Sequence, residues 1–146
     1  MKLHDVLNRQ IANWNVLYVK LHHYHWFVKG EQFFTLHAKF EELYNEAAAY
    51  IDDLAERLLT IGGKPAATLK QYLELATIRE ATGSETAEQM VKTLAEDFSS
   101  VVRELKQGVE IAGEEKDEVT ADLLLSIQAN VEKQVWMLKA YLGTSV

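Results

Sequence analysis

The sequence predicts an all-α protein, a bundle of four long helices, and three observations carry this prediction. The chain has 146 residues of which 48% are hydrophobic, enough to bury one core and too apolar for a disordered chain. It holds one proline and seven glycines, few for a protein built from many strands and turns. Apolar side chains recur at steps of three, four and seven residues, which is the spacing of one helix face.

The first two helices are expected on either side of a glycine. The apolar spacing predicts a helix over residues 3–29, and Gly30 follows it as a stop signal. A second helix is expected over residues 33–60 and ends at the sequence Gly-Gly-Lys-Pro of residues 62–65, because proline cannot continue a helix. A tight turn therefore joins this pair.

A longer connection and a second pair of helices complete the expected bundle. Residues 66–83 form the connection, with a short helix at residues 69–73. The third long helix is expected over residues 85–112, the acidic residues 114–118 make a turn, and the last helix covers residues 118–142. We expect the core face of this last helix to begin at Val119.

Two tight turns and one long crossover give the connectivity of a ferritin-like four-helix bundle. The sequence contains no domain boundary, so residues 1–146 are expected to form a single domain.

Composition excludes several classes of function. The chain has no cysteine, so any metal site must use His, Asp, Glu or backbone oxygens. Its 15 basic and 22 acidic residues give a net charge of −7, which disfavours nucleic acid as the default partner. It lacks the usual nucleotide-binding and hydrolase motifs. No apolar run suggests a membrane span or a signal peptide, and we expect a cytoplasmic protein without a membrane partner.

Five polar residues form the candidate site. His25 lies on the apolar stripe of the first helix, whereas His37, Glu41, Asp52 and Glu56 fall within about 100° of one another around the second helix. A partly buried stripe of imidazole and carboxylate groups is costly unless something satisfies them. Such mixed ligation suits iron, manganese or zinc better than magnesium or calcium.

The spacing along the second helix divides these residues into two half-sites. His37 and Asp52 are 15 residues apart, or about 22 Å along a helix, so one ion cannot bridge them. An antiparallel two-fold pairing with a second copy would bring each half-site onto the other. Ala47, Ala48 and Ala49 lie near the midpoint and are small enough for two helices to approach closely. The spacing thus favours an isologous dimer with two identical metal sites.

Simpler interpretations remain for each residue. A buried histidine is often a satisfied core residue, and a carboxylate stripe is often a solvated helix face. The polar stripe would then set the specificity of a purely structural helical oligomer. Trp26 either packs in the core or lies against a redox site, and His4, His22 and His23 are expected on the surface.

Four segments resemble the Dps family, the dodecameric miniferritins of bacteria. They are residues 24–30, 33–37, 51–57 and 135–143, and the similarity extends over nearly the whole chain. The resemblance implies a protein that oxidises Fe(II) with hydrogen peroxide or O2 and stores the ferric product in a shell of twelve subunits. It also implies two irons at each ferroxidase site, between two-fold-related subunits.

The resemblance also implies roles for individual residues. His25 and His37 match the family's site histidines, and Asp52 and Glu56 match the carboxylates from the partner chain. Glu41 stands where many members carry an aspartate that binds metal, and Trp26 matches the tryptophan beside the site.

Iron entry and DNA binding are two further properties of the family. The resemblance places the start of the last helix near the three-fold axes, where Asp122 matches a pore carboxylate and Glu114 and Glu118 match more loosely. These acids are otherwise explained as a solvated turn and helix start. A lysine-rich arm is absent before the first helix and after Gly143, so we do not expect the family's DNA binding to carry over. A DNA-compacting nucleoid protein is the alternative function.

Overall fold

The computed structural model describes residues 1–143, and the expected absence of a basic arm after Gly143 concerns residues outside this range. The described chain contains helices and no strand, which confirms the all-α prediction. The helices are α1 (Leu3–Phe27), α2 (Phe33–Thr60), α3 (Leu69–Leu75), α4 (Ala87–Glu114) and α5 (Glu118–Leu142).

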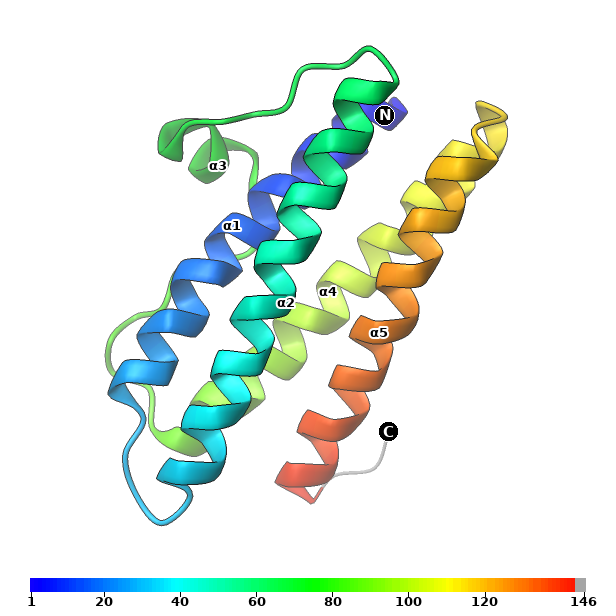
Figure 1. Cartoon of the computed structure of the whole chain (residues 1–146). Coiled ribbons are helices and arrows are strands. Elements are labelled where there is room, and N and C mark those ends of the chain that lie inside the picture. Colours follow the sequence, from blue (N-terminus) through cyan, green and yellow to red (C-terminus); the bar gives the residue numbers. More distant parts are fainter. Residues whose placement is uncertain (144–146) are drawn as a thin grey trace.

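The helices form two antiparallel hairpins joined by a crossover (Figure 1). A short loop joins α1 to α2, and another joins α4 to α5. The crossover leaves the far end of α2, carries α3 along the outside of α1, and returns to the opposite end of the bundle where α4 begins (Figure 1). This is the ferritin-like connectivity that the loop lengths predict.

Aromatic rings fill the middle of the bundle. Trp14 of α1 is fully buried, and its ring centroid lies 4.8 Å from that of Tyr50 on α2 and 5.8 Å from that of Phe98 on α4. Because these side chains pack closely, they fill the centre of the bundle and leave no space there for a binding site. The polar residues of the candidate site therefore lie elsewhere, with the buried His25 near the end of α1 and the other four half-buried or exposed on α2.

Three polar side chains of α1 hold the crossover in place. Asn13 accepts hydrogen bonds from the backbone N–H groups of residues 77 and 78. Lys20 donates to the Arg79 carbonyl oxygen and pairs with Asp97, both at 2.7 Å. The Tyr24 hydroxyl donates to Glu85 at 2.7 Å. The crossover is thus fixed against the helix that ends at the candidate site.

The helix boundaries differ from the expected ones by two residues at four places, one of which is the end of α3 at Leu75 and not at residue 73. α1 ends at Phe27, not at residue 29, since Val28 is extended and Gly30 has a φ of +112° that glycine adopts readily. α4 begins at Ala87, not at residue 85, because Thr86 forms the capping box with Gln89. α4 also continues to Glu114, two residues beyond the expected end.

The prediction that the core face of α5 begins at Val119 is wrong by one residue, because the first buried side chain is that of Thr120. The Val119 side chain is 63% exposed, whereas Thr120 and Leu124 are fully buried. Asp117 caps the helix by accepting from the Thr120 N–H, and Arg57 donates to the Thr120 hydroxyl oxygen. Thr120 can therefore face the core with its polar groups bonded.

Among the helices of residues 1–143, none is long and apolar enough to cross a membrane.

Candidate functional site

Two histidines meet where α1 ends and α2 begins. The Nδ1 atom of His25 lies 2.7 Å from the His37 carbonyl oxygen, and the Nδ1 atom of His37 lies 2.7 Å from the His25 carbonyl oxygen. Their rings stack with centroids 3.7 Å apart and an interplanar angle of 12°. The two residues therefore fix each other through a reciprocal pair of hydrogen bonds.

This reciprocal pair determines which ring nitrogens are free. A carbonyl oxygen can only accept, so each Nδ1 must carry the proton and donate it. In the neutral imidazole the lone pair then lies on Nε2 of both rings. A histidine that donates through one nitrogen to a carbonyl and presents the other as a lone pair is prepared to bind a metal ion.

The early end of α1 makes this arrangement possible. In a helix that continued to residue 29, the Lys29 N–H would bond to the His25 carbonyl oxygen. Because α1 ends at Phe27, that carbonyl has no helical partner and accepts from His37 instead. The early end of α1 and the reciprocal bonding of the two histidines are thus one feature of the chain.

Glu41 lies beside the histidine pair, one helical turn beyond His37. Its Oε1 atom is 3.8 Å from Nε2 of His25. The His25 residue is only 6% exposed, whereas the Glu41 side chain is 54% exposed, so this group of three opens toward solvent on the carboxylate side. The structure brings together one half-site as the spacing predicts.

The second half-site lies far along α2. Asp52 and Glu56 are exposed and one turn apart. A hydrogen bond shared with Asp52 and the negative charge of Asp52 raise the pKa of Glu56 above its ordinary value. Two carboxyl groups in this position favour a proton or a cation between them.

The two half-sites do not share an ion within one chain. Their separation of about 22 Å along α2 is ten times a metal–ligand bond length. In residues 1–143 no group of three or more His, Asp or Glu side chains could hold a metal ion by itself. Within the described part of one chain, neither half-site is therefore a complete metal site.

An aromatic group that the sequence reasoning missed surrounds the histidine pair. The ring of Tyr44 lies edge-on to His25, with centroids 5.3 Å apart, and stacks flat on His22 at 3.8 Å. Trp26 is 65% exposed, and its ring lies 5.2 Å from His22. His22 was expected at the surface, but it is half-buried beside the site. The missed signal is its spacing, since His22 precedes His25 by three residues on the same helix face.

The acidic turn between α4 and α5 has a partly structural role. Glu114, Glu118 and Asp122 are exposed, as a pore lining requires. Asp117 pairs with Arg57 at 3.2 Å and caps α5. Glu115 accepts the Leu3 N–H at the start of α1. The three candidate pore residues thus differ from Asp117 and Glu115, whose side chains form the contacts that hold the turn to the bundle.

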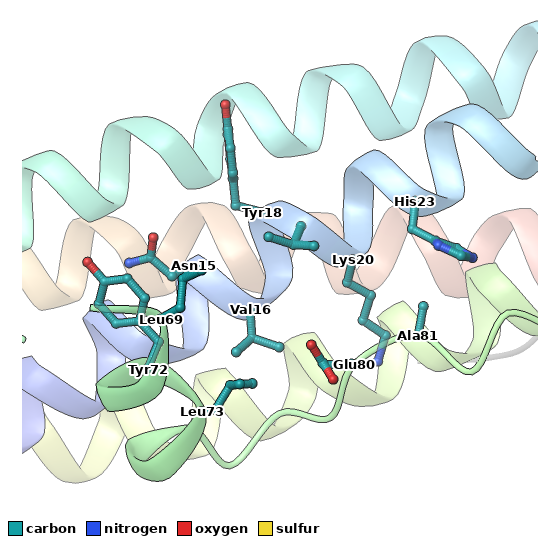
Figure 2. Close-up of a pocket in the computed structure, with 11 residues that line it drawn as sticks. Asn15, Val16, Tyr18, Lys20, His23, Leu69, Tyr72, Leu73, Glu80 and Ala81 are labelled. Atoms are coloured by element: carbon teal, nitrogen blue, oxygen red, sulfur yellow. The ribbon is translucent and has the colours of Figure 1, made fainter. Parts of the chain in front are cut away.

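A separate groove of about 530 Å³ lies between α1, α3 and the crossover (Figure 2). Figure 2 shows Leu69, Tyr72 and Leu73 of α3 on one side of it and Val16 of α1 on the other, whereas the Tyr18 side chain points away from α3. Its lining is largely apolar, and it contains none of the five candidate ligands. The groove therefore has the character of a packing surface and not of a metal site.

Comparison with known proteins gives a consistent assignment. Residues 4–145 match the ferritin-like domain family. General stress protein 20U of Bacillus subtilis is 61% identical over 142 residues, which are 97% of this chain and 98% of that protein. DNA protection during starvation protein 2 of Bacillus anthracis is 57% identical and covers 95% of each chain. The crystal structure of a Dps protein from Bacillus brevis is 58% identical, covers 96% of this chain and 94% of that one, and superposes with a TM-score of 0.95.

Proposed function

The chain belongs to the Dps family of ferritin-like proteins, and we propose that it oxidises Fe(II), preferably with hydrogen peroxide, and stores the ferric product. The observation that carries this proposal is the reciprocal hydrogen bonding of His25 and His37, which leaves both Nε2 lone pairs available for iron. Iron is the substrate of this reaction, and imidazole with carboxylate ligands suits it.

The complete site is proposed to form between two copies of the chain. An antiparallel two-fold pairing of α2 places the partner's Asp52 and the partner's Glu56 opposite the histidine pair, and the reverse. Ala48 and Ala49, near the midpoint of the helix, are exposed and allow close approach. The exposed side chains of Trp26 and Val19 support a covered surface on this side of the bundle.

The proposed chemistry uses two irons in each site. Each Fe(II) gives up one electron, and the O–O bond of hydrogen peroxide breaks as it accepts both, so the products are two Fe(III) and two hydroxide ions. Glu56 would bridge the two irons, and their positive charge would favour the ionised form of this carboxyl, whose pKa is raised by its hydrogen bond with Asp52 and by the charge of Asp52. His25, His37, Glu41 and Asp52 would complete the coordination of two ions held close together. Paired one-electron steps release no hydroxyl radical.

Storage is proposed in a hollow cytoplasmic shell of twelve copies. A hydrated Fe(II) ion cannot cross an apolar bundle and needs a polar channel. Glu114, Glu118 and Asp122 are the proposed lining of that channel, because they are acidic, exposed and near in sequence to the α4–α5 turn. The net charge of −7 on each chain favours attraction of Fe(II).

DNA compaction is the second candidate function, and the name of the Bacillus anthracis relative favours it. Protection of DNA also follows from removal of Fe(II) and peroxide without contact with DNA. The net charge of −7 favours this indirect route, since duplex DNA binds through its phosphates.

Anaerobic titration with Fe(II) followed by hydrogen peroxide tests the proposal. We expect two Fe(II) oxidised per peroxide and no spin-trapped hydroxyl radical. One Fe(II) per peroxide with trapped radical, or a rate no greater than that of free Fe(II), would contradict it. A gel shift with and without magnesium tests DNA binding separately.

A further inference from the structure

Tyr44 contacts His25, which the other histidine of the pair also contacts. His37 stacks on the His25 ring, with centroids 3.7 Å apart. The Tyr44 ring meets His25 edge-on at 5.3 Å with an interplanar angle of 86°. The His25 imidazole is therefore held by a hydrogen bond at Nδ1, by a stacked ring and by a perpendicular ring.

Tyr44 is itself fixed by a second pair of rings. It stacks on His22 at 3.8 Å with an interplanar angle of 17°, and Tyr18 meets both rings edge-on. The His22 ring is anchored because its Nδ1 lies 2.8 Å from the Tyr18 carbonyl oxygen. Tyr18, His22 and Tyr44 form a ring cluster that joins α1 to α2 next to the site.

The Tyr44 hydroxyl does not explain this arrangement. Burial and the charge of Glu41 raise the pKa of Tyr44, which opposes loss of the phenol proton. What the residue supplies is the edge of an aromatic ring, in the geometry that aromatic pairs prefer. A smaller side chain would leave the His25 ring held only by its Nδ1 hydrogen bond and by the His37 stack, with more freedom to turn about its Cβ–Cγ bond.

We propose that Tyr44, supported by His22 and Tyr18, is a positioning residue that fixes the direction of the His25 Nε2 lone pair toward the metal. This inference rests on the proposed function of the histidine pair. It extends that function to residues outside the ligand set, since a ligand must be held within narrow limits of distance and angle to bind metal well.

Three variants separate the ring from other effects. Tyr44→Leu removes the ring, and Tyr44→Phe keeps the ring without the hydroxyl. Tyr50→Leu is the matched control, because Tyr50 is a half-buried tyrosine on the same helix that packs on Trp14 and not on His25. Thermal unfolding of all three measures the loss of packing.

The first measurement is a Co(II) titration followed by visible absorption, which reports affinity and ligand geometry. We expect Tyr44→Leu to weaken Co(II) binding by about tenfold and to change the absorption bands, with Tyr44→Phe within about twofold of the unmodified protein. Tyr50→Leu should leave both unchanged. Unaltered binding in Tyr44→Leu, an equal loss in Tyr44→Phe, or an equal loss in Tyr50→Leu would each overturn the proposal.

The second measurement needs no metal. In ¹⁵N-histidine solid-state NMR of the metal-free assembly, we expect a single Nδ1–H tautomer for His25 that becomes heterogeneous in Tyr44→Leu and stays single in Tyr44→Phe. A sharp, unchanged His25 signal in Tyr44→Leu would overturn the positioning role. If the unmodified protein bound no Co(II), the proposed function would fail, while this measurement would still decide whether Tyr44 fixes the ring.

Discussion

Mixing two inactive variants should restore activity if the site is shared between two chains. We expect His25→Ala and Asp52→Ala, each prepared alone, to lose rapid Fe(II) oxidation, to about a tenth of the original rate or less. In a two-fold dimer of one chain of each kind, one site carries both defects. The other site receives His25 from one chain and Asp52 from its partner, and it is intact.

The size of the restored activity follows from the geometry. His25 lies beside His37, and Asp52 lies about 22 Å further along α2, so the two cannot act on one ion within a chain. In an equimolar mixture with random pairing, half of the dimers are mixed, and half of their sites are intact. The mixture should therefore recover about one quarter of the activity of the unmodified protein.

The assay compares two mixtures of refolded chains with different affinity tags. The control pairs His25→Ala with His37→Ala, whose residues lie in the same half-site, so every site in every dimer keeps one defect. We expect initial rates of Fe(II) oxidation near one quarter in the first mixture and near the single-variant level in the control. Equal rates in the two mixtures, with mixed dimers verified by both tags, would refute ligands shared across a two-fold axis.

Three further predictions concern other parts of the chain. Asp122→Asn should slow Fe(II) uptake at low Fe(II) and low ionic strength while scattering shows an unchanged assembly; equal uptake rates would place the entry route elsewhere. At physiological salt without divalent cations, duplex DNA should show no retardation in a gel, because of the net charge of −7; tight, salt-sensitive binding would reveal a basic surface. Although burial alone would raise it, hydrogen bonds from Tyr24 and Thr82 lower the pKa of Glu85 from 4.5 to about 2. The ionised Glu85 carboxylate therefore stabilises the fold above pH 4.5, and this stabilisation is lost as the pH falls to about 2. Glu85→Gln should lower the thermal unfolding midpoint at pH 7, and the difference from the unmodified protein should shrink toward pH 2. A difference that does not change with pH would contradict this.

The bundle was predictable because each long helix buries one stripe of side chains. That stripe repeats at the helical period, and hydropathy alone reveals it. The face of α5 was less certain for a physical reason, since Leu123, Leu124 and Leu125 are consecutive and fit any face. Its buried positions also include two polar residues, Thr120, whose hydroxyl oxygen accepts from Arg57, and Gln134, whose Nε2 donates to Glu46. Such tertiary hydrogen bonds leave no trace in a hydropathy pattern.

The end of α1 shows where local signals stop being sufficient. Gly30 marks a stop but fixes its place only to within two residues. α1 ends at Phe27 because Val28 is extended and buried, and because the His25 carbonyl oxygen accepts from His37 across the turn and not from the next helical N–H. Spacing predicted that the two histidines are neighbours. Their tautomers and the rings of Tyr44 and His22 depend on side-chain packing that spacing does not encode.

The incompleteness of each half-site within one chain is an argument for its assembly. One end of α2 presents two Nε2 lone pairs beside an exposed glutamate, and the other end presents two carboxyl groups that repel each other. Either arrangement alone has an unfavourable electrostatic cost and no partner to offset it. In the proposed two-fold assembly, Fe(II) bound between the carboxyl pair of one chain and the histidine nitrogens of its partner would offset both costs, at both ends of the interface. The same helix would then supply both halves of the proposed site.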